Sequence, residues 1–428
     1  MSEKKADQLW KIHGEYYDLA PFLASHPGGD VIQLGKGRDC TELWESVHLL
    51  SDKPRTLLAR FRVDPPIDAL TSPEIFTWED DGFYRTVQRR VRAYFATIES
   101  DAKATSAYFV RWAALFIAWL LLVIGGLWGG NLWLAALAGL SIEILDNTVS
   151  HDGSHNAVSR RQWINKLASY TQYLYFWAHP VWADHHVFAH HSYTGVQGLD
   201  PDLDNNFLQR KSQDQQVRWW HRGQSVLTLL YLPWTMTLVQ SGAYVWSLLF
   251  SQPIFGVPFQ RPKHELARAL TLWAISFVIH FVIPFALLPF WTAIGVIAAY
   301  YVTQSLYYWA AVAPNHDTYA TVRHGEESLS IEHLTKHPID WGEKQVRSTG
   351  DFKLVNADWT ARMNWFFGGI QYQIEHHLFP TVSHCHYPAI ASIVEKTCRE
   401  FAIPYASPTW GRALVDYHKA LTYLASQR

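Results

Sequence analysis

Four long apolar stretches, arranged as two pairs, constrain the fold most strongly. Residues 107–128 and 132–149 form the first pair, which is divided by Gly129-Gly130-Asn131. Residues 267–290 and 291–313 form the second pair, with a break at Leu288-Pro289-Phe290. Each stretch is near the roughly 20 residues that an α-helix needs to cross a bilayer core. The chain is therefore predicted to contain an α-helical polytopic membrane domain of about four transmembrane helices, with interfacial helices and a cytosolic cap.

Basic residues flank the first pair on both sides and set its predicted orientation. Positive residues favour the cytosolic face, so both ends of this hairpin are expected in the cytosol. The flanking residues are Arg90, Arg92, Lys103, Arg160, Arg161 and Lys166.

Composition narrows the class of protein. Aromatic residues make up 15% of the chain and charged residues only 17%, a balance typical of proteins with interfacial surface. The net charge of -2 gives no support for nucleic-acid binding. Three scattered cysteines are too few for a disulfide framework, which indicates a reducing environment. The polar first fourteen residues lack an apolar core, so no cleaved signal peptide is expected.

Three histidine-rich boxes lie at or near the ends of apolar stretches. Neutral imidazole suits borderline metals such as iron, and seven box histidines exceed what one tetrahedral zinc needs, so two metals are expected. A spacing of four residues places two imidazoles on one helix face. No His-Glu-x-x-His helix is present, which disfavours a zinc protease. The box residues are His151 and His155; His186, His190 and His191; and Gln373, His376 and His377.

Residues 227–250 are apolar but interrupted by Pro233 and Ser241-Gly242. One additional crossing here would place the third box on the opposite membrane face from the other two. The segment is therefore expected to lie in the interface or to dip into the bilayer and return.

Residues 9–63 precede the membrane body and contain a second histidine pattern. In His26-Pro27-Gly28-Gly29, the glycines permit close approach to a flat ligand, and His48 follows a short predicted helix. This stretch resembles cytochrome b5, which implies a small α+β domain with haem b held axially by His26 and His48, suited to electron transfer. Nearby acids could steer a basic reductase or simply form a solvated face; they are Asp30, Asp39, Glu42 and Glu45.

The boxes resemble those of the membrane-bound fatty acid desaturases, a non-haem diiron family. Gln373 in place of the first histidine of the third box, the lead-in 364–372 and Leu378-Phe379-Pro380 are similar to its front-end subgroup, which also carries a cytochrome b5 domain. The resemblance implies two non-haem irons and adds His316 to the ligands. It leaves open whether Gln373 coordinates metal or only forms hydrogen bonds.

The resemblance implies a front-end acyl desaturase that inserts a cis double bond between the carboxyl end and an existing double bond. The implied partners are a fatty acyl lipid or acyl-CoA, O2, membrane lipid and NADH-cytochrome b5 reductase, which supplies two electrons through the fused domain. Both termini and the active site would face the cytosol, in the endoplasmic reticulum membrane. The expected organisation is a haem domain at 1–64, a linker with a surface helix at 65–104 and a desaturase domain at 105–428.

Several alternatives remain open at this point. A sphingolipid long-chain-base desaturase or a lipid hydroxylase would share the diiron site; a non-catalytic membrane haem protein and a metal transporter are less favoured. His186 is preferred over His185 as a ligand because it lies one turn before His190. Four acids are candidates for orienting ligands, and other histidines are expected to be structural. The acids are Glu143, Asp146, Asp152 and Glu375, and the structural histidines are His179, His280, His384 and His386.

Overall fold

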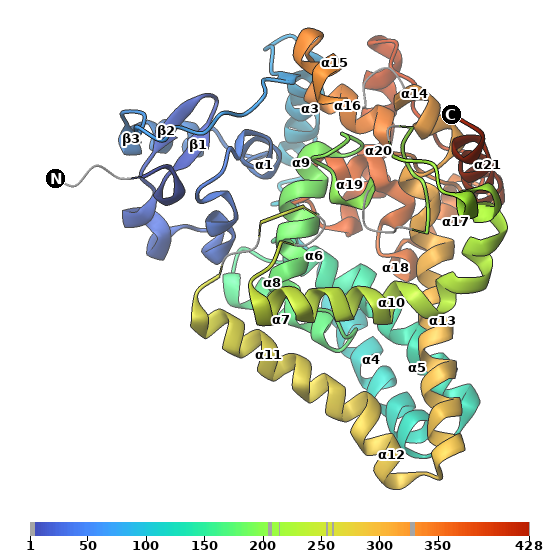
Figure 1. Cartoon of the computed structure of the whole chain (residues 1–428). Helices are drawn as coiled ribbons and strands as arrows, with labels where there is room; N and C mark the ends of the chain where they lie inside the picture. Colours follow the sequence, from blue (N-terminus) through green and yellow to red (C-terminus); the bar gives the residue numbers. More distant parts are fainter. Residues whose placement is uncertain are drawn as a thin grey trace.

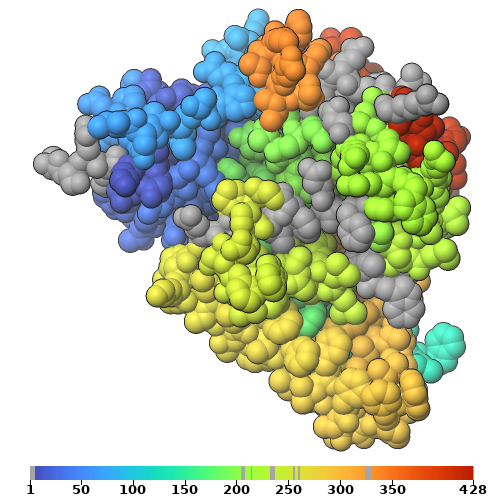
Figure 2. Space-filling view, in the orientation of Figure 1, coloured from blue at the N-terminus to red at the C-terminus, as the bar shows by residue number. Residues whose placement is uncertain are grey.

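The computed structural model describes residues 5–203, 208–213, 215–253, 256–258, 261–325 and 330–427, and it is mostly helical (Figure 1). An N-terminal domain packs beside a helical body, which tapers from a cap at one end to a tip formed by long helices (Figure 1). Figure 2 shows the N-terminal domain, in blue, against the green segment that carries the second histidine box.

The N-terminal domain forms around a small antiparallel sheet in the order β1-β2-β3. Trp10 and Ile12 of β1 are buried, because alternate residues of the strand face the domain core. The indole Nε1 of Trp10 donates a hydrogen bond to the Ile32 carbonyl at 2.7 Å. The regular elements are β1 (Trp10–Ile12), β2 (Glu15–Tyr17), α1 (Thr41–Val47), α2 (Lys53–Leu58) and β3 (Arg62–Val63).

The first apolar pair forms a helical hairpin. Helix α4 (Ser106–Val123) continues to Trp128, and α5 (Leu132–Leu145) continues through α6 (His151–Ser154). Asn131 caps the second helix, since its side-chain oxygen accepts from the backbone amides of Trp133 and Leu134. The second helix thus runs five residues beyond the predicted end and carries the start of the first box.

The second pair also has the predicted break. Helix α11 (Lys263–Phe277) runs on through α12 (Ile283–Leu287), and α13 (Phe290–His316) follows Pro289. Within the described residues, three helices are long and apolar enough to span a membrane: Ser106–Trp128, Leu132–Ser154 and Lys263–Leu287. The expected count of about four is therefore not confirmed. Helix α13 carries polar residues such as Gln304 and Ser305, which are buried inside the protein and lower its hydropathy.

Helix α10 (Gln224–Phe250) covers the expected interfacial segment. Its backbone is helical throughout, so Pro233 and Ser241-Gly242 do not interrupt it. Helix α10 lies across the body, transverse to α13, and packs against α13 and α11 (Figure 1).

The cap is built from sequence-distant helices. Helix α3 buries residues spaced about one turn apart, among them Tyr84, Val87 and Val91, against α20, so the predicted linker helix packs into the cap. Strand β4 pairs in parallel with β5. The cap elements are β4 (Phe76–Thr77), α3 (Phe83–Thr97), α14 (Tyr319–Gly325), α15 (Ile331–Lys336), β5 (Ile339–Asp340), α16 (Trp341–Ser348), α17 (Ala357–Arg362), α18 (Asn364–Phe367), α19 (Gln373–Leu378), α20 (Tyr387–Glu400) and α21 (Trp410–Ser426); α7 (Gln162–Tyr170), α8 (His179–Trp182) and α9 (His191–Tyr193) lie between the two hairpins in sequence.

Candidate metal centre and haem pocket

Five box histidines from three separate chain segments converge in one buried group. The Nε2 atom of His186 lies 3.0 Å from His151 Nε2 and 3.1 Å from His191 Nε2. One ligand atom of each ring lies within 4.8 Å of those of the others. The members are His151, His155, His186, His191 and His376.

A second group lies beside the first and contains His190, His316 and His377. The side-chain amide of Gln373 lies 3.3 Å from His316 Nε2 and 3.4 Å from His377 Nε2, so this glutamine adds a fourth polar group. The two groups together contain all eight histidines that the sequence singled out as metal ligands.

The second box is wound as a π-helix, which changes its predicted geometry. A four-residue spacing was expected to place His186 and His190 on one α-helical face. In the structure, residues Ala183–His190 form π-type turns, in which residue i bonds to i+5. His186 therefore shares the first group with His191, whereas His190 enters the second. The two rings still lie side by side, with centroids 5.2 Å apart, as the four-residue spacing predicted, but they belong to different groups.

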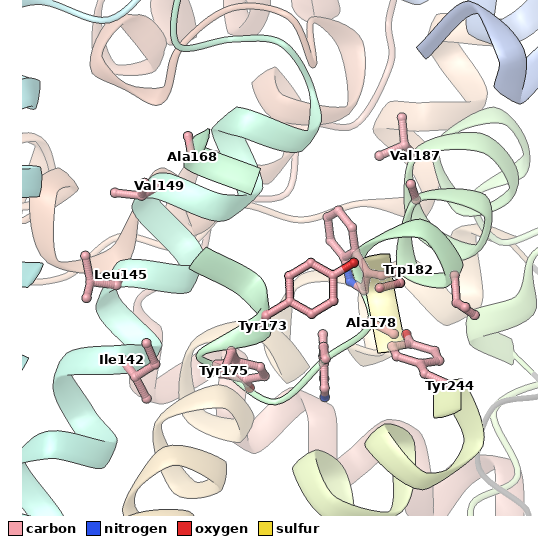
Figure 3. Packing of buried hydrophobic residues seen from close by; sticks show 14 of the residues in the cluster. Ile142, Leu145, Val149, Ala168, Tyr173, Tyr175, Ala178, Trp182, Val187 and Tyr244 are labelled. Carbon is pink, nitrogen blue, oxygen red and sulfur yellow. The ribbon is translucent and has the colours of Figure 1, made fainter. Parts of the chain in front are cut away.

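Aromatic packing supports the second box and joins it to the first, because Trp182 contacts both His186 and His151. Trp182 stacks on the His186 ring at a centroid distance of 4.4 Å. Figure 3 shows Ile142 and Leu145 of α5 and, across from them, Tyr175 and Trp182 in the same buried cluster. His185 instead bonds to the Tyr244 hydroxyl and to Asp202, so the choice of His186 as the box residue agrees with the structure.

Four of the rings are also fixed through their Nδ1 atoms, which leaves Nε2 available to the group. Metal-bound histidines commonly have such a partner on the second nitrogen, because it fixes the tautomer and the ring orientation. The pairs are His376 with the Tyr387 hydroxyl at 3.0 Å, His377 with Gln345 Oε1 at 3.0 Å, His190 with Asp200 at 3.0 Å and His316 with the Ser348 carbonyl at 3.2 Å.

Unpartnered buried atoms show that the two groups fit metal ions. Nε2 of His155, Nε2 of His376 and Oε1 of Gln373 are buried without a hydrogen-bond partner, which is costly unless a ligand satisfies them. Burial also lowers the pKa of His186 and His376 well below the ordinary value, so these rings are neutral, as metal coordination requires. The donor set is rich in nitrogen and suits iron.

Asp200 and Asp202 were not singled out from the sequence, although they follow the second box closely. Burial alone would lower the pKa of His190, but the two carboxylates raise it to about 9. The same ring forms a further candidate metal group with both acids. The sequence feature that could have identified these two partners of His190 is the pair of aspartates in the loop after the histidine box.

Of the four acids that were expected to orient box histidines, three bond to other residues. Asp152 lies beside His151 in sequence, but its carboxylate accepts from Ser383 and bonds to His384. That expectation is wrong because neighbouring residues on a helix point in different directions. Among the described residues, Asp146 accepts from Ser150, Glu375 accepts from Tyr405, and Glu143 has no hydrogen-bond partner.

The haem signature contains two imidazoles, each held through one ring nitrogen. His26 Nδ1 bonds to the Gly29 carbonyl at 3.2 Å, and His48 Nδ1 bonds to the Trp44 carbonyl at 2.8 Å, so both Nε2 atoms would be available to hold a haem iron. Burial, with a smaller contribution from nearby His26, lowers the pKa of His48 to about 4. A Cβ on Gly28 would overlap the His26 ring. These residues fit haem b.

The acids near the haem do not form a free acidic face. Glu45 is buried and bonds to His13, Arg55 and Arg85. Asp30 pairs with Lys166 of the helical body at 2.9 Å. The remaining two are Asp39, which pairs with Lys11, and Glu42, which accepts from Tyr193. These acids hold the domain together or attach it to the body.

Comparison with known proteins gives two family matches. The model of "Fatty acid desaturase" matches residues 131–409, and that of "Cytochrome b5-like Heme/Steroid binding domain" matches residues 1–64. The chain is 30% identical to an acyl-lipid (7-3)-desaturase of Chlamydomonas reinhardtii, over 92% of the chain and 76% of the relative. It is 27% identical to acyl-lipid (8-3)-desaturase B of Dictyostelium discoideum (96% and 90%) and 29% identical to an sn-1 linoleoyl-lipid 6-desaturase of Arthrospira platensis (78% and 90%).

Proposed function

Because the chain belongs to the fatty acid desaturase family and carries a cytochrome b5-like domain, we propose that it is a front-end acyl desaturase. It inserts a cis double bond between the carboxyl end and an existing double bond of a polyunsaturated acyl chain. The observation that carries this proposal is the convergence of eight histidines, six buried and two half-buried, in two adjacent groups at the end of apolar helices. The relatives are named for acyl lipids, which favours this substrate over a sphingoid base.

Each group would hold one iron. The first iron would bind His151, His155, His186, His191 and His376, and the second would bind His190, His316 and His377, with Gln373 close by. When bound, the iron pair supplies the O2-dependent oxidant that an unactivated methylene requires and that side chains cannot provide. The protein residues hold the ligands in place and keep water away from the groups.

The haem domain would supply the two electrons, received from NADH through a cytochrome b5 reductase. Tethering raises the local concentration of the donor. The domain is also held in place by contacts with the body, among them Lys166–Asp30 and Tyr193–Glu42. Its position against the second box supports direct delivery of electrons to this centre.

The proposed topology has four crossings, with α13 as the fourth, and α10 in the interface. His151 near the end of α5 and His316 at the end of α13 both belong to the candidate centre, so these helices must finish at the same face. We assign that face and both termini to the cytosol, in the endoplasmic reticulum membrane. The segments are the haem domain at 1–64, the linker at 65–104 and the desaturase domain at 105–428.

Expression in yeast fed with candidate polyunsaturated fatty acids tests the proposal, with new double bonds located by mass spectrometry. His376→Ala should abolish the product and reduce non-haem iron while the haem spectrum persists. The matched control is His333→Ala, since His333 is exposed and outside both groups. Product from the His376→Ala variant, or a hydroxylated or sphingoid product from the unmodified protein, would refute the proposal.

A further inference from the structure

A cavity of about 280 Å³ opens beside the start of α4, on the side of the protein where the histidine boxes lie. It lies between the first turns of α4 and the loop regions around α18 and α20. No described residue that lines it is acidic. The lining residues are Thr105, Arg111, Ala361, Arg362, Asn364, Trp365, His384, Cys385 and Pro388.

Two arginines give this cavity its chemical character. Arg111 lies in the second turn of the span Ser106–Trp128, and Arg362 ends α17. Neither arginine forms an ion pair with any residue that the structure describes, and both side chains are exposed. A charged residue at the start of a span is unfavourable unless it reaches the interface and finds a counter-charge. The unbalanced pair therefore calls for an anion at membrane depth.

We propose that this cavity binds the phosphate of an acyl phospholipid and holds the substrate by its headgroup. The inference rests on the proposed function and specifies its acyl carrier. Arginine donates in a planar fork that matches phosphate oxygens, and basic pockets between spans bind lipid headgroups. Trp365 at the rim is 40% exposed, as suits an interfacial ring beside a lipid.

The cavity is also near the candidate metal centre. His384 lines the cavity, and its Nδ1 lies 2.9 Å from Asp152, the residue after His151. In a front-end reaction only a few carbons separate the headgroup ester from the new double bond. The headgroup site must therefore be close to the metal groups, as this cavity is.

A second cavity has the wrong charge for this role. It has a volume of about 90 Å³ and reaches His190 and His316, but Asp200, Asp202 and Asp317 line it. Lys211, its one described lysine, is already paired with Asp317 at 3.1 Å. A phosphate there would face three carboxylates, whereas the arginine cavity offers it only neutral and basic side chains.

Acyl-CoA and free phosphate share the anionic chemistry, so the test includes both. The full-length protein in neutral detergent is titrated with dioctanoyl phosphatidylcholine, dioctanoylglycerol, octanoyl-CoA or inorganic phosphate, and its thermal unfolding midpoint is recorded. Phosphatidylcholine should stabilise the protein more than the other three probes. Arg111→Gln and Arg362→Gln should each weaken this binding roughly tenfold, because each removes a charge-assisted contact. The matched control is Arg161→Gln, an exposed arginine outside the cavity.

Steady-state kinetics on acyl phosphatidylcholine give the second readout, in which both cavity variants should raise KM and the control should not. Equal stabilisation by dioctanoylglycerol, or variants that bind like the unmodified protein, would overturn the phosphate site. A stronger response to octanoyl-CoA or inorganic phosphate would overturn the phospholipid assignment. A lack of product from the unmodified protein would instead refute the proposed function, since the binding assay requires no turnover.

Discussion

Arg38 of the haem domain and Asp184 of the second-box helix form an ion pair, with 2.7 Å between Arg38 Nη1 and Asp184 Oδ1. Arg261 reaches the other carboxylate oxygen at 2.8 Å. The Arg38 guanidinium also lies over the Phe188 ring, 4.5 Å from its centroid. Because Asp184 is almost fully buried, this contact attaches the haem domain directly to the π-helix that presents His186 and His190.

Asp184→Ala should loosen this attachment. Removing one partner of a buried ion pair costs about 3–5 kcal/mol, because Arg38 and Arg261 would remain without a counter-charge. We expect an unchanged haem spectrum, faster hydrogen exchange in residues 183–191 and slower NADH-driven desaturation. The control is Asp52→Ala, which breaks the exposed pair with Arg92 and should cost at most about 1 kcal/mol. Equal exchange in the two variants would contradict a docked haem domain.

Tyr387→Phe removes the hydroxyl that holds His376 Nδ1 and leaves the ring in place. Loss of such a partner typically reduces metal affinity about 10- to 100-fold, since the imidazole is no longer fixed in orientation. Non-haem iron retained after dialysis against a chelator should fall, and haem content should not. Tyr94→Phe is the control, because the Tyr94 hydroxyl makes no described contact with either metal group. Iron retention equal to that of the control would refute an orienting role.

The sequence allowed the hairpins and the ligand set to be predicted because both depend on local patterns. Gly129-Gly130-Asn131 was predicted to divide the first pair. In the structure it does so, and Asn131 caps the start of α5. The histidine boxes identified seven members of the two groups, and the family resemblance added His316. Apolar length alone could not establish whether α13 spans the membrane. Its polar residues face the protein interior and lower its hydropathy.

The remaining features depend on tertiary contacts that spacing does not reveal. The π-helix at the second box moves His190 into a different group from His186, although the sequence is compatible with an ordinary helix. Asp152 is adjacent to His151 yet bonds to His384, 232 residues away in the chain. Tyr387 and Gln345 reach the centre only after the cap has folded.

Gly139→Ala should disturb the alignment of the two metal groups. A Cβ at Gly139 would overlap the Tyr300 backbone carbonyl where α5 crosses α13. Small residues allow this close approach of helices, and overpacking typically costs about 1–3 kcal/mol. Since these helices carry His151 and His316, both the unfolding midpoint and iron content should decrease.

Gly242→Ala is the matched control for that variant. Gly242 lies in α10, and nothing lies within 4 Å of an added Cβ. Alanine favours a helix over glycine by up to about 1 kcal/mol, so this change should be neutral or stabilising. A loss of stability in Gly242→Ala as large as in Gly139→Ala would show that the helix crossing is not the cause.

Glu45 should make the attachment of the haem domain dependent on acidic pH. Burial alone would raise its pKa, but hydrogen bonds from His13 and Arg85 and the charges of Arg85 and Arg55 lower it to about 2, from an ordinary value of 4.5. Because the folded-state pKa is depressed, the stabilisation is complete above about pH 4.5 and is lost as the pH falls towards 2. The difference corresponds to about 3 kcal/mol of unfolding free energy.

Glu45→Gln removes the titrating group and should therefore weaken this loss of stability at acidic pH. Thermal unfolding and haem retention, followed by the Soret band between about pH 6 and pH 3, should depend less on pH in the variant. The variant should also be less stable at neutral pH, because Arg55 and Arg85 lose a buried partner. Glu15→Gln is the control, since Glu15 forms an exposed pair with Arg62 that solvent screens. If stability fell as steeply with decreasing pH in Glu45→Gln as in this control, Glu45 would not be the group that governs the acid-induced loss of stability.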